Sequence, residues 1–184
     1  MAEKREMTTQ KKSGFSISDL ILVAVLLAAG AVLKLTVGTV VNFFGMKPNF
    51  IIAMYCLALL LIRPSRIGTA VVQAAAIGII SGAICQLLPG TPWLNFISEL
   101  LGAVAMSLLI RIPMKIGKLN FSTAVSAFIA TIISGSAFVA CLFLFTGAVT
   151  KSLVAYIPIV FFTALINAVI VQLLYLPLKA VLKK

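Results

Sequence analysis

The chain has 184 residues, of which 62% are hydrophobic and only 10% are charged. Soluble globular proteins average about 45–50% apolar and about 25% charged residues, so this composition excludes a water-soluble domain and predicts an integral membrane protein. A net charge of +11 could indicate nucleic-acid binding. However, the Lys and Arg residues lie in short clusters between apolar segments, which is typical of membrane topology. We therefore expect no nucleic-acid partner.

Six apolar segments follow in chain order, at residues 20–41, 50–62, 67–88, 93–110, 121–145 and 153–178. A helix that crosses the membrane needs about 20 residues, at a rise of about 1.5 Å each. Five segments meet this length, whereas residues 50–62 would cover only about 20 Å. The sequence therefore predicts an all-α membrane protein in which residues 18–184 form a bundle of six transmembrane helices. Residues 1–17 are polar and basic, and we expect a disordered cytoplasmic tail there.

The basic residues between the segments predict the orientation of the bundle. If the N-terminus is cytoplasmic, twelve of the fifteen Lys and Arg residues lie on the inner side, and only Lys34, Lys47 and Lys151 lie on the outer side. This positive-inside bias predicts that both termini are cytoplasmic in a multi-pass protein of the cell membrane. A signal peptide cleaved near residues 29–31 is the alternative, but the apolar segment continues past Ala31, which favours a retained helix.

The second, fourth and sixth helices would begin at the outer face. Pro48 fits the first turn of the short second helix, and Thr91 and Pro92 fit the start of the fourth. The positive dipole ends of such helices attract an anionic group. The residues before the short helix would dip below the membrane surface, where irregular backbone must be buried or line a cavity. Lys47 is therefore a candidate partner of a ligand carboxylate, or else a lysine that reaches the headgroups.

Glu99 is a carboxylate inside the fourth apolar segment, where a charge costs about 2.5–3.5 kcal/mol or more. Asn95 lies one helical turn before it, so both side chains would share a face. Three interpretations stay open for Glu99: an ion pair with Lys47 or Lys34, a proton relay, or a contact to a cationic group of a ligand. A carboxylate that faces an ammonium and helix N-termini would match a zwitterion, of which an amino acid is the simplest.

Aromatic and amide side chains of the apolar segments are further candidates for the same site. Trp93 and Phe96, with the Phe pair at residues 43–44, could form the wall around a ligand side chain. Trp93 would equally suit the aromatic belt at a membrane interface. Asn167 lies about mid-depth in the sixth segment, where its amide would bond another helix or a ligand.

Several function classes lack support in the sequence. It contains no G-x-x-x-x-G-K-[ST] nucleotide loop and no His, and a single intramembrane carboxylate does not suit paired-carboxylate catalysis. Cys56, Cys85 and Cys141 have no metal-ligand spacing and are interpreted as packing residues. We therefore expect no enzyme and no metal or cofactor site, and any ATP hydrolysis would occur in partner subunits. Six spans in so short a chain leave little room for two rocking halves, which disfavours a self-sufficient transporter.

Five motifs occur in a characteristic order: GMKPN at residues 45–49, GIISG at 78–82, LPGTPWLN at 88–95, TIISG at 131–135, and LIN…LYLP at 165–177. With an A-x-x-x-A formed by Ala24 and Ala28, the chain resembles the S components of energy-coupling factor (ECF) transporters, and specifically the tryptophan-transporter (TrpP-like) family. The resemblance implies a subunit that binds its solute from outside and joins a membrane scaffold subunit and two cytoplasmic ATPase subunits. Ala24 and Ala28 would then face the scaffold, and the segment around Lys47 and Asn49 would lie in the pocket.

The residues and the resemblance lead to one hypothesis, that the chain captures tryptophan or a related amino acid. Glu99 would hold the ammonium, Lys47 and the adjacent helix N-terminus the carboxylate, and the aromatic residues the ring. The predicted substrate-binding residues are Lys47, Asn49, Trp93, Asn95, Phe96, Glu99 and Asn167. The alternatives are an S component for a vitamin or nucleobase-like precursor, a self-sufficient transporter or channel, and a membrane scaffold protein without a small ligand.

Overall fold

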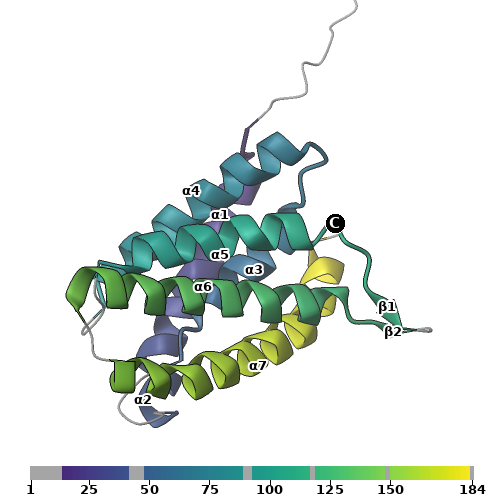
Figure 1. The fold of residues 1–184 in the computed structure, drawn as a ribbon. Coiled ribbons are helices and arrows are strands. Elements are labelled where there is room, and N and C mark those ends of the chain that lie inside the picture. The colour runs from purple at the N-terminus through teal and green to yellow at the C-terminus, as the bar shows by residue number, and fades with distance from the viewer. Residues whose placement is uncertain (1–13, 42–47, 89–92, 117–118, 148–149, 183–184) are drawn as a thin grey trace, which may run out of the picture.

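The computed structural model describes residues 14–41, 48–88, 93–116, 119–147 and 150–182 (Figure 1). The helices are α1 (Ile17–Leu35), α2 (Val37–Val40), α3 (Ile51–Ile62), α4 (Ile67–Gln86), α5 (Asn95–Leu109), α6 (Ser122–Thr146) and α7 (Thr150–Val181). Because α2 is a single turn that continues α1, the described residues form the six-helix bundle that the apolar segments predict. Most of the predicted N-terminal tail lies outside the described residues. The connection after α5, predicted as a loop, contains the short antiparallel strands β1 (Lys115–Ile116) and β2 (Leu119–Asn120).

The helix lengths differ from the prediction at one of the six segments. Four helical stretches in the described residues are long and apolar enough to cross a membrane: Ile17–Val40, Ile67–Gln86, Ser122–Thr146 and Val154–Val181. The short helix α3 has 12 residues, as expected. In contrast, α5 begins only at Asn95 and has 15 residues, which span about 22 Å. Trp93 and Leu94 instead form a turn, in which the Phe96 N–H donates to the Trp93 carbonyl at 3.1 Å. The expectation that this segment is a full-length span is therefore wrong.

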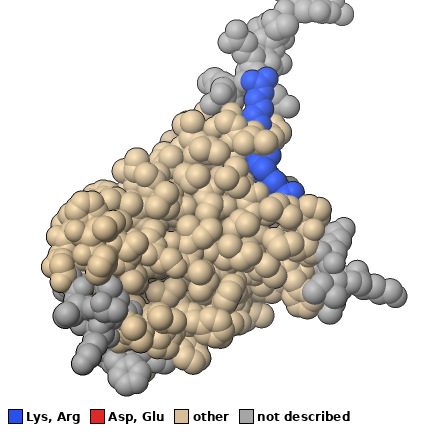
Figure 2. Space-filling model, viewed as in Figure 1, with Lys and Arg blue, Asp and Glu red and all other residues tan. Residues whose placement is uncertain are grey.

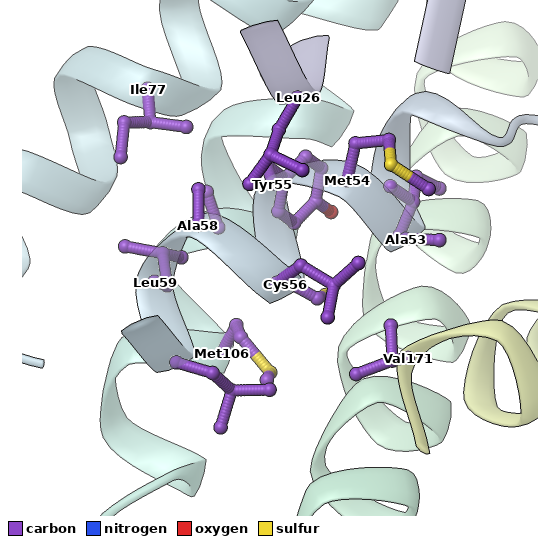
Figure 3. Packing of buried hydrophobic residues seen from close by; sticks show 14 of the residues in the cluster. Leu26, Ala53, Met54, Tyr55, Cys56, Ala58, Leu59, Ile77, Met106 and Val171 are labelled. Carbon is purple, nitrogen blue, oxygen red and sulfur yellow. The ribbon is translucent and has the colours of Figure 1, made fainter. Parts of the chain in front are cut away.

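The short helix α3 is the centre of the bundle. Every residue from Ile51 to Leu61 is buried, and α1, α4, α5, α6 and α7 all contact this helix. Figure 3 shows Tyr55 and its neighbours on α3 surrounded by Leu26, Ile77 and Val171 from three other helices. A helix that is apolar on all sides is stable only inside such a core. The start of α3 is consequently enclosed by other helices.

The side chain of Asn49 forms a hydrogen bond at the start of α3, and Pro48 precedes the helix. The first helical residue is Ile51, so the expectation that Pro48 occupies the first turn is wrong. The side-chain Oδ1 of Asn49 accepts a hydrogen bond from the Ile51 N–H at 3.3 Å. This bond satisfies a backbone donor that the first turn of a helix leaves without a partner. The same bond holds the Asn49 side chain at the start of the central helix α3.

Two glycines of the GIISG motif bring α4 against α5. A Cβ atom at Gly78 would lie 2.7 Å from the Cα of Leu100 and 2.8 Å from the carbonyl oxygen of Glu99. A Cβ atom at Gly82 would lie 2.8 Å from the Cα of Phe96. Only glycine allows the two backbones to approach this closely, as in other G-x-x-x-G contacts between membrane helices. The motif thereby sets the position of Glu99 relative to α4.

Replacing Gly78 by Ala is therefore expected to lower the free energy of unfolding by about 1–3 kcal/mol, because the new methyl group must push two backbones apart. Thermal unfolding of the purified protein in detergent would measure this. Gly68→Ala is the matched control, since nothing lies within 4 Å of a Cβ at that position. Equal melting temperatures of the two variants would contradict the close contact between α4 and α5.

Basic side chains gather at the end of the bundle where α3 and α5 finish. Arg111 donates to the carbonyls of Pro64 at 2.7 Å and Ser65 at 3.2 Å, and Arg63 donates to the carbonyl of Ile110 at 3.0 Å. Figure 2 shows one face of the molecule as largely uncharged, with Lys and Arg atoms confined to a strip near one edge. This distribution agrees with the charge bias of the sequence, and the cytoplasmic location of this end stays a prediction.

Candidate functional site

Asn49 connects polar side chains from three helices beside the start of α3. Its Nδ2 group donates to Oε1 of Glu99 on α5 and lies 3.9 Å from Sγ of Cys85 on α4. Its backbone carbonyl accepts a hydrogen bond from Nδ2 of Asn167 on α7 at 3.2 Å. Glu99 and Asn167 are fully enclosed, with 1% and 0% of their surface exposed. Residues far apart in the sequence thus meet in one buried group.

The same group extends to α1 and α6. Nζ of Lys34 on α1 donates to Sγ of Cys85 at 3.5 Å, and Nδ2 of Asn167 lies 3.5 Å from Oγ1 of Thr131 on α6. Both Lys34 and Thr131 are buried. We call the connected residues the polar network; its members are Lys34, Asn49, Cys85, Glu99, Thr131 and Asn167. Helices α1, α4, α5, α6 and α7 each contribute one residue to this network, and the short helix α3 begins beside it.

A glycine leaves space for two hydroxyl groups close to the network. Gly102 follows Glu99 by three residues on the buried face of α5. A Cβ atom at Gly102 would collide with the Tyr55 hydroxyl and lie 2.7 Å from Cβ of Ser134. The absence of a side chain at position 102 therefore admits the hydroxyl groups of α3 and α6 to the stretch of α5 that carries Glu99.

Three buried oxygen atoms in this region have no hydrogen-bond partner among the described residues: Oε2 of Glu99, Oδ1 of Asn167 and the Tyr55 hydroxyl. A buried polar atom left without a partner costs about 1–3 kcal/mol. Oε2 of Glu99 and Oδ1 of Asn167 can only accept hydrogen bonds, whereas the Tyr55 hydroxyl can also donate; an ammonium group offers three donors. The free acceptors of the region therefore suit a cationic group.

Lys34 does not neutralise Glu99 directly. In the described part of the chain, its ammonium forms no ion pair with Glu99 and donates to Cys85 instead. A direct ion pair between Lys34 and Glu99, one of the interpretations that the sequence left open, is thus excluded. A pair between Lys47 and Glu99 stays a prediction, because Lys47 lies outside the described residues. Two opposite charges therefore lie in one network without being paired to each other.

The predicted site residues fall into three groups. Asn49, Glu99 and Asn167 come together in the polar network, and Asn95 is buried one turn before Glu99 on the same face of α5. Trp93 and Phe96 do not join them: Trp93 is 53% exposed and its ring packs against Phe145 with centroids 5.3 Å apart. Phe96 is 36% exposed and contacts α4 at Gly82. The pair at residues 43–44 lies, like Lys47, outside the described residues.

Sequence reasoning missed several residues of the region. Cys85 was interpreted as a packing residue, but its thiol contacts both Lys34 and Asn49. Tyr55 was not considered, although it is the only hydroxyl-bearing residue of the otherwise apolar α3 and this contrast was a usable signal. Thr131 and Ser134 were quoted only as part of a motif. Their roles depend on which helices are neighbours, and hydropathy does not reveal this.

Ala24 and Ala28 lie on the outside of α1. Both are exposed in the single chain, as are Ile21 and Val25 on the same helix. Such a surface of small and apolar side chains is available to lipid or to another membrane protein. The predicted contact with a scaffold subunit therefore stays a prediction that is compatible with the position of these residues.

Comparison with known proteins supports a role in transport. A family model described as "Tryptophan transporter TrpP" matches residues 16–183. A curated relative from Clostridium acetobutylicum, described as a probable tryptophan transport protein, is 26% identical over 166 residues, which cover 89% of this chain and 93% of the relative. No solved structure matches the chain. Since the family match extends over nearly all of the residues that form the bundle, this multi-pass protein of the cell membrane belongs to the tryptophan transporter TrpP family.

Proposed function

We propose that this chain is the substrate-binding subunit of an ECF-type importer, which captures tryptophan or a related amino acid at the outer face and delivers it inward together with ATP-hydrolysing partners. The observation that carries the proposal is the buried polar network at the start of α3. Charged and unpartnered polar groups inside a membrane protein are costly, and they usually mark a substrate or ion pathway. Membership of the family favours tryptophan over a vitamin or nucleobase-like precursor.

Within this site, Glu99 would receive the ligand ammonium. Oε1 of Glu99 already accepts from Asn49, so Oε2 is free to accept from the ligand, with Oδ1 of Asn167 as a second acceptor. An ammonium bonded to these oxygens would satisfy atoms that otherwise stay without partners. Asn95, Trp93 and Phe96 lie at or just before the start of α5, and we assign them to the entrance of the site. Lys47 is retained as a candidate from the sequence alone.

The orientation of the bundle follows from the charge distribution in this proposal. The end that carries Arg63 and Arg111 would face the cytoplasm, together with both termini, because basic residues favour the inner side. The start of α3 and the start of α5 would then open towards the outside. A solute would reach the polar network from that side.

Uptake of a solute against its concentration gradient requires a source of energy. The sequence has no nucleotide-binding loop, so the energy for uphill uptake would come from two cytoplasmic ATPase subunits joined by a membrane scaffold subunit. Ala24 and Ala28 would contact the scaffold, since their small side chains permit a close approach of helices.

Native mass spectrometry of the chain, purified alone and after co-expression with candidate ECF subunits, tests this function. We expect the mass of tryptophan on the single chain and a four-subunit complex after co-expression. The double variant Ala24→Leu/Ala28→Leu should keep the ligand and lose the complex, whereas Ala155→Leu, at an exposed position of α7, should keep both. A bound vitamin, or uptake of tryptophan into liposomes that contain only this chain, would favour the alternatives.

A further inference from the structure

Lys34 is a buried cation whose described surroundings do not satisfy it. Only 8% of its surface is exposed, and its one hydrogen-bond acceptor in the described residues is the Cys85 thiol at 3.5 Å. A thiol is a weak acceptor, whereas an ammonium group carries three donors. A buried charge is costly unless it is paired and hydrogen-bonded. The position therefore calls for an anionic group that the described side chains do not supply.

The ordinary explanation for a lysine near the end of a membrane helix does not fit this position. Such lysines usually extend along the helix and place the ammonium among the lipid headgroups. Lys34 instead turns into the bundle, to a residue of α4. It lies in the last turn of α1, where the negative end of the helix dipole stabilises a cation. The position of Lys34 therefore suits contact with an anionic ligand group.

The polar network places this cation and a carboxylate at opposite ends of a short chain of contacts. Lys34 bonds Cys85, Cys85 contacts Asn49, and Asn49 bonds Glu99. Lys34 thus offers free N–H donors at one end, and Oε2 of Glu99 offers a free acceptor at the other. An α-amino acid carries the complementary groups, a carboxylate and an ammonium, on one carbon atom.

We propose that Lys34 binds the carboxylate of the substrate, so that Lys34 and Glu99 together select zwitterionic amino acids over amines and acids that carry the same ring. This inference rests on the proposed function, because it takes the ligand to be a tryptophan-like amino acid. It assigns to Lys34 the role that the sequence suggested for Lys47. Asn49 and Cys85 are then positioning residues that separate the two charges.

Binding of three ligands to the purified chain tests this assignment: tryptophan, tryptamine, which lacks the carboxylate, and indole-3-propionate, which lacks the ammonium. The unmodified chain should prefer tryptophan to each analogue by about 10- to 100-fold, the range expected for one hydrogen-bonded charged group. Lys34→Met should weaken tryptophan and indole-3-propionate by a similar factor and leave tryptamine unchanged. Glu99→Gln should weaken tryptophan and tryptamine and leave indole-3-propionate unchanged.

Two lysine variants serve as controls. Lys179→Met removes a charge from an exposed position of α7 and should change the binding of no ligand. Lys47→Met should retain the preference for tryptophan over tryptamine if Lys34 holds the carboxylate. Loss of this preference in Lys47→Met, together with its retention in Lys34→Met, would overturn the assignment.

The remaining outcomes separate the inference from the function on which it rests. If the unmodified chain binds tryptophan but Lys34→Met weakens all three ligands equally, or none, the inference is wrong and the proposed function stands. If the unmodified chain binds no tryptophan, the proposed function fails as well. Should Lys34→Met not fold, Lys34→Arg serves as the second variant and should still prefer tryptophan to tryptamine. Equal binding of tryptamine and tryptophan by the unmodified chain would by itself overturn the role of Lys34.

Discussion

Glu99→Gln is expected to lower the affinity for tryptophan by about 10- to 100-fold, which corresponds to the loss of one charge-assisted hydrogen bond. The free energy of unfolding should stay the same or rise. Gln keeps an oxygen that can accept from Asn49 Nδ2, and it removes a buried charge that has no ion-pair partner in the described chain. Calorimetric titration with tryptophan and thermal unfolding of the same preparation would measure both effects.

Asp19→Asn is a matched control for this change, since it removes a carboxylate far from the polar network. Asp19 accepts from the N–H of Ser16 at 3.3 Å and from its hydroxyl at 2.7 Å, and so caps the start of α1. Its replacement should leave the affinity for tryptophan unchanged and affect stability by at most about 1 kcal/mol. If Glu99→Gln binds tryptophan as tightly as the unmodified chain, Glu99 does not contact the substrate.

Asn49→Ala is expected to have the largest combined effect on folding and binding. It removes the hydrogen-bond partner of Glu99 Oε1 and the acceptor of the Ile51 N–H at the same time. The buried Glu99 carboxylate left without this partner and the lost hydrogen bond to the Ile51 N–H together should lower the free energy of unfolding by about 2–4 kcal/mol. Tryptophan affinity should fall too, because the carboxylate is no longer held in position.

A double-mutant cycle tests whether the cost arises from Glu99. In the Glu99→Gln background, Asn49→Ala should be less destabilising, since a neutral amide is easier to leave without a partner than a carboxylate. Thermal or denaturant unfolding of the four proteins would supply the coupling energy. Strictly additive effects would show that Asn49 stabilises α3 independently of the carboxylate.

The sequence predicted the helices well because the membrane thickness restricts the length of apolar segments. It predicted their interruptions less well. The first segment is interrupted at Thr36, between α1 and α2, where the Val32 carbonyl accepts both the Thr36 N–H at 2.9 Å and the Thr36 hydroxyl at 2.8 Å. Such an added side-chain bond often bends a helix. Hydropathy does not register this effect, and the same limitation applies to the turn at Trp93 that shortens α5.

The candidate site was predicted in part for a similar reason. Glu99 and Asn167 stood out because a polar residue in an apolar segment requires a partner. Phe96 was grouped with Glu99 by proximity in the sequence, but its ring is partly exposed and packs against α4 at Gly82, whereas Glu99 is buried. Lys34 was named only as a possible ion-pair partner. Its contact with Cys85 arises because α1 and α4 are neighbours, and this depends on packing between helices.

An experimental structure of the chain with bound tryptophan tests the central claim, that the polar network is the substrate site, most directly. We predict that the tryptophan ammonium lies within hydrogen-bond distance of the Glu99 carboxylate, among the helices that surround α3. A tryptophan molecule bound elsewhere, for example against Trp93 and Phe145 on the outside of the bundle, with Glu99 still bonded only to Asn49, would contradict it.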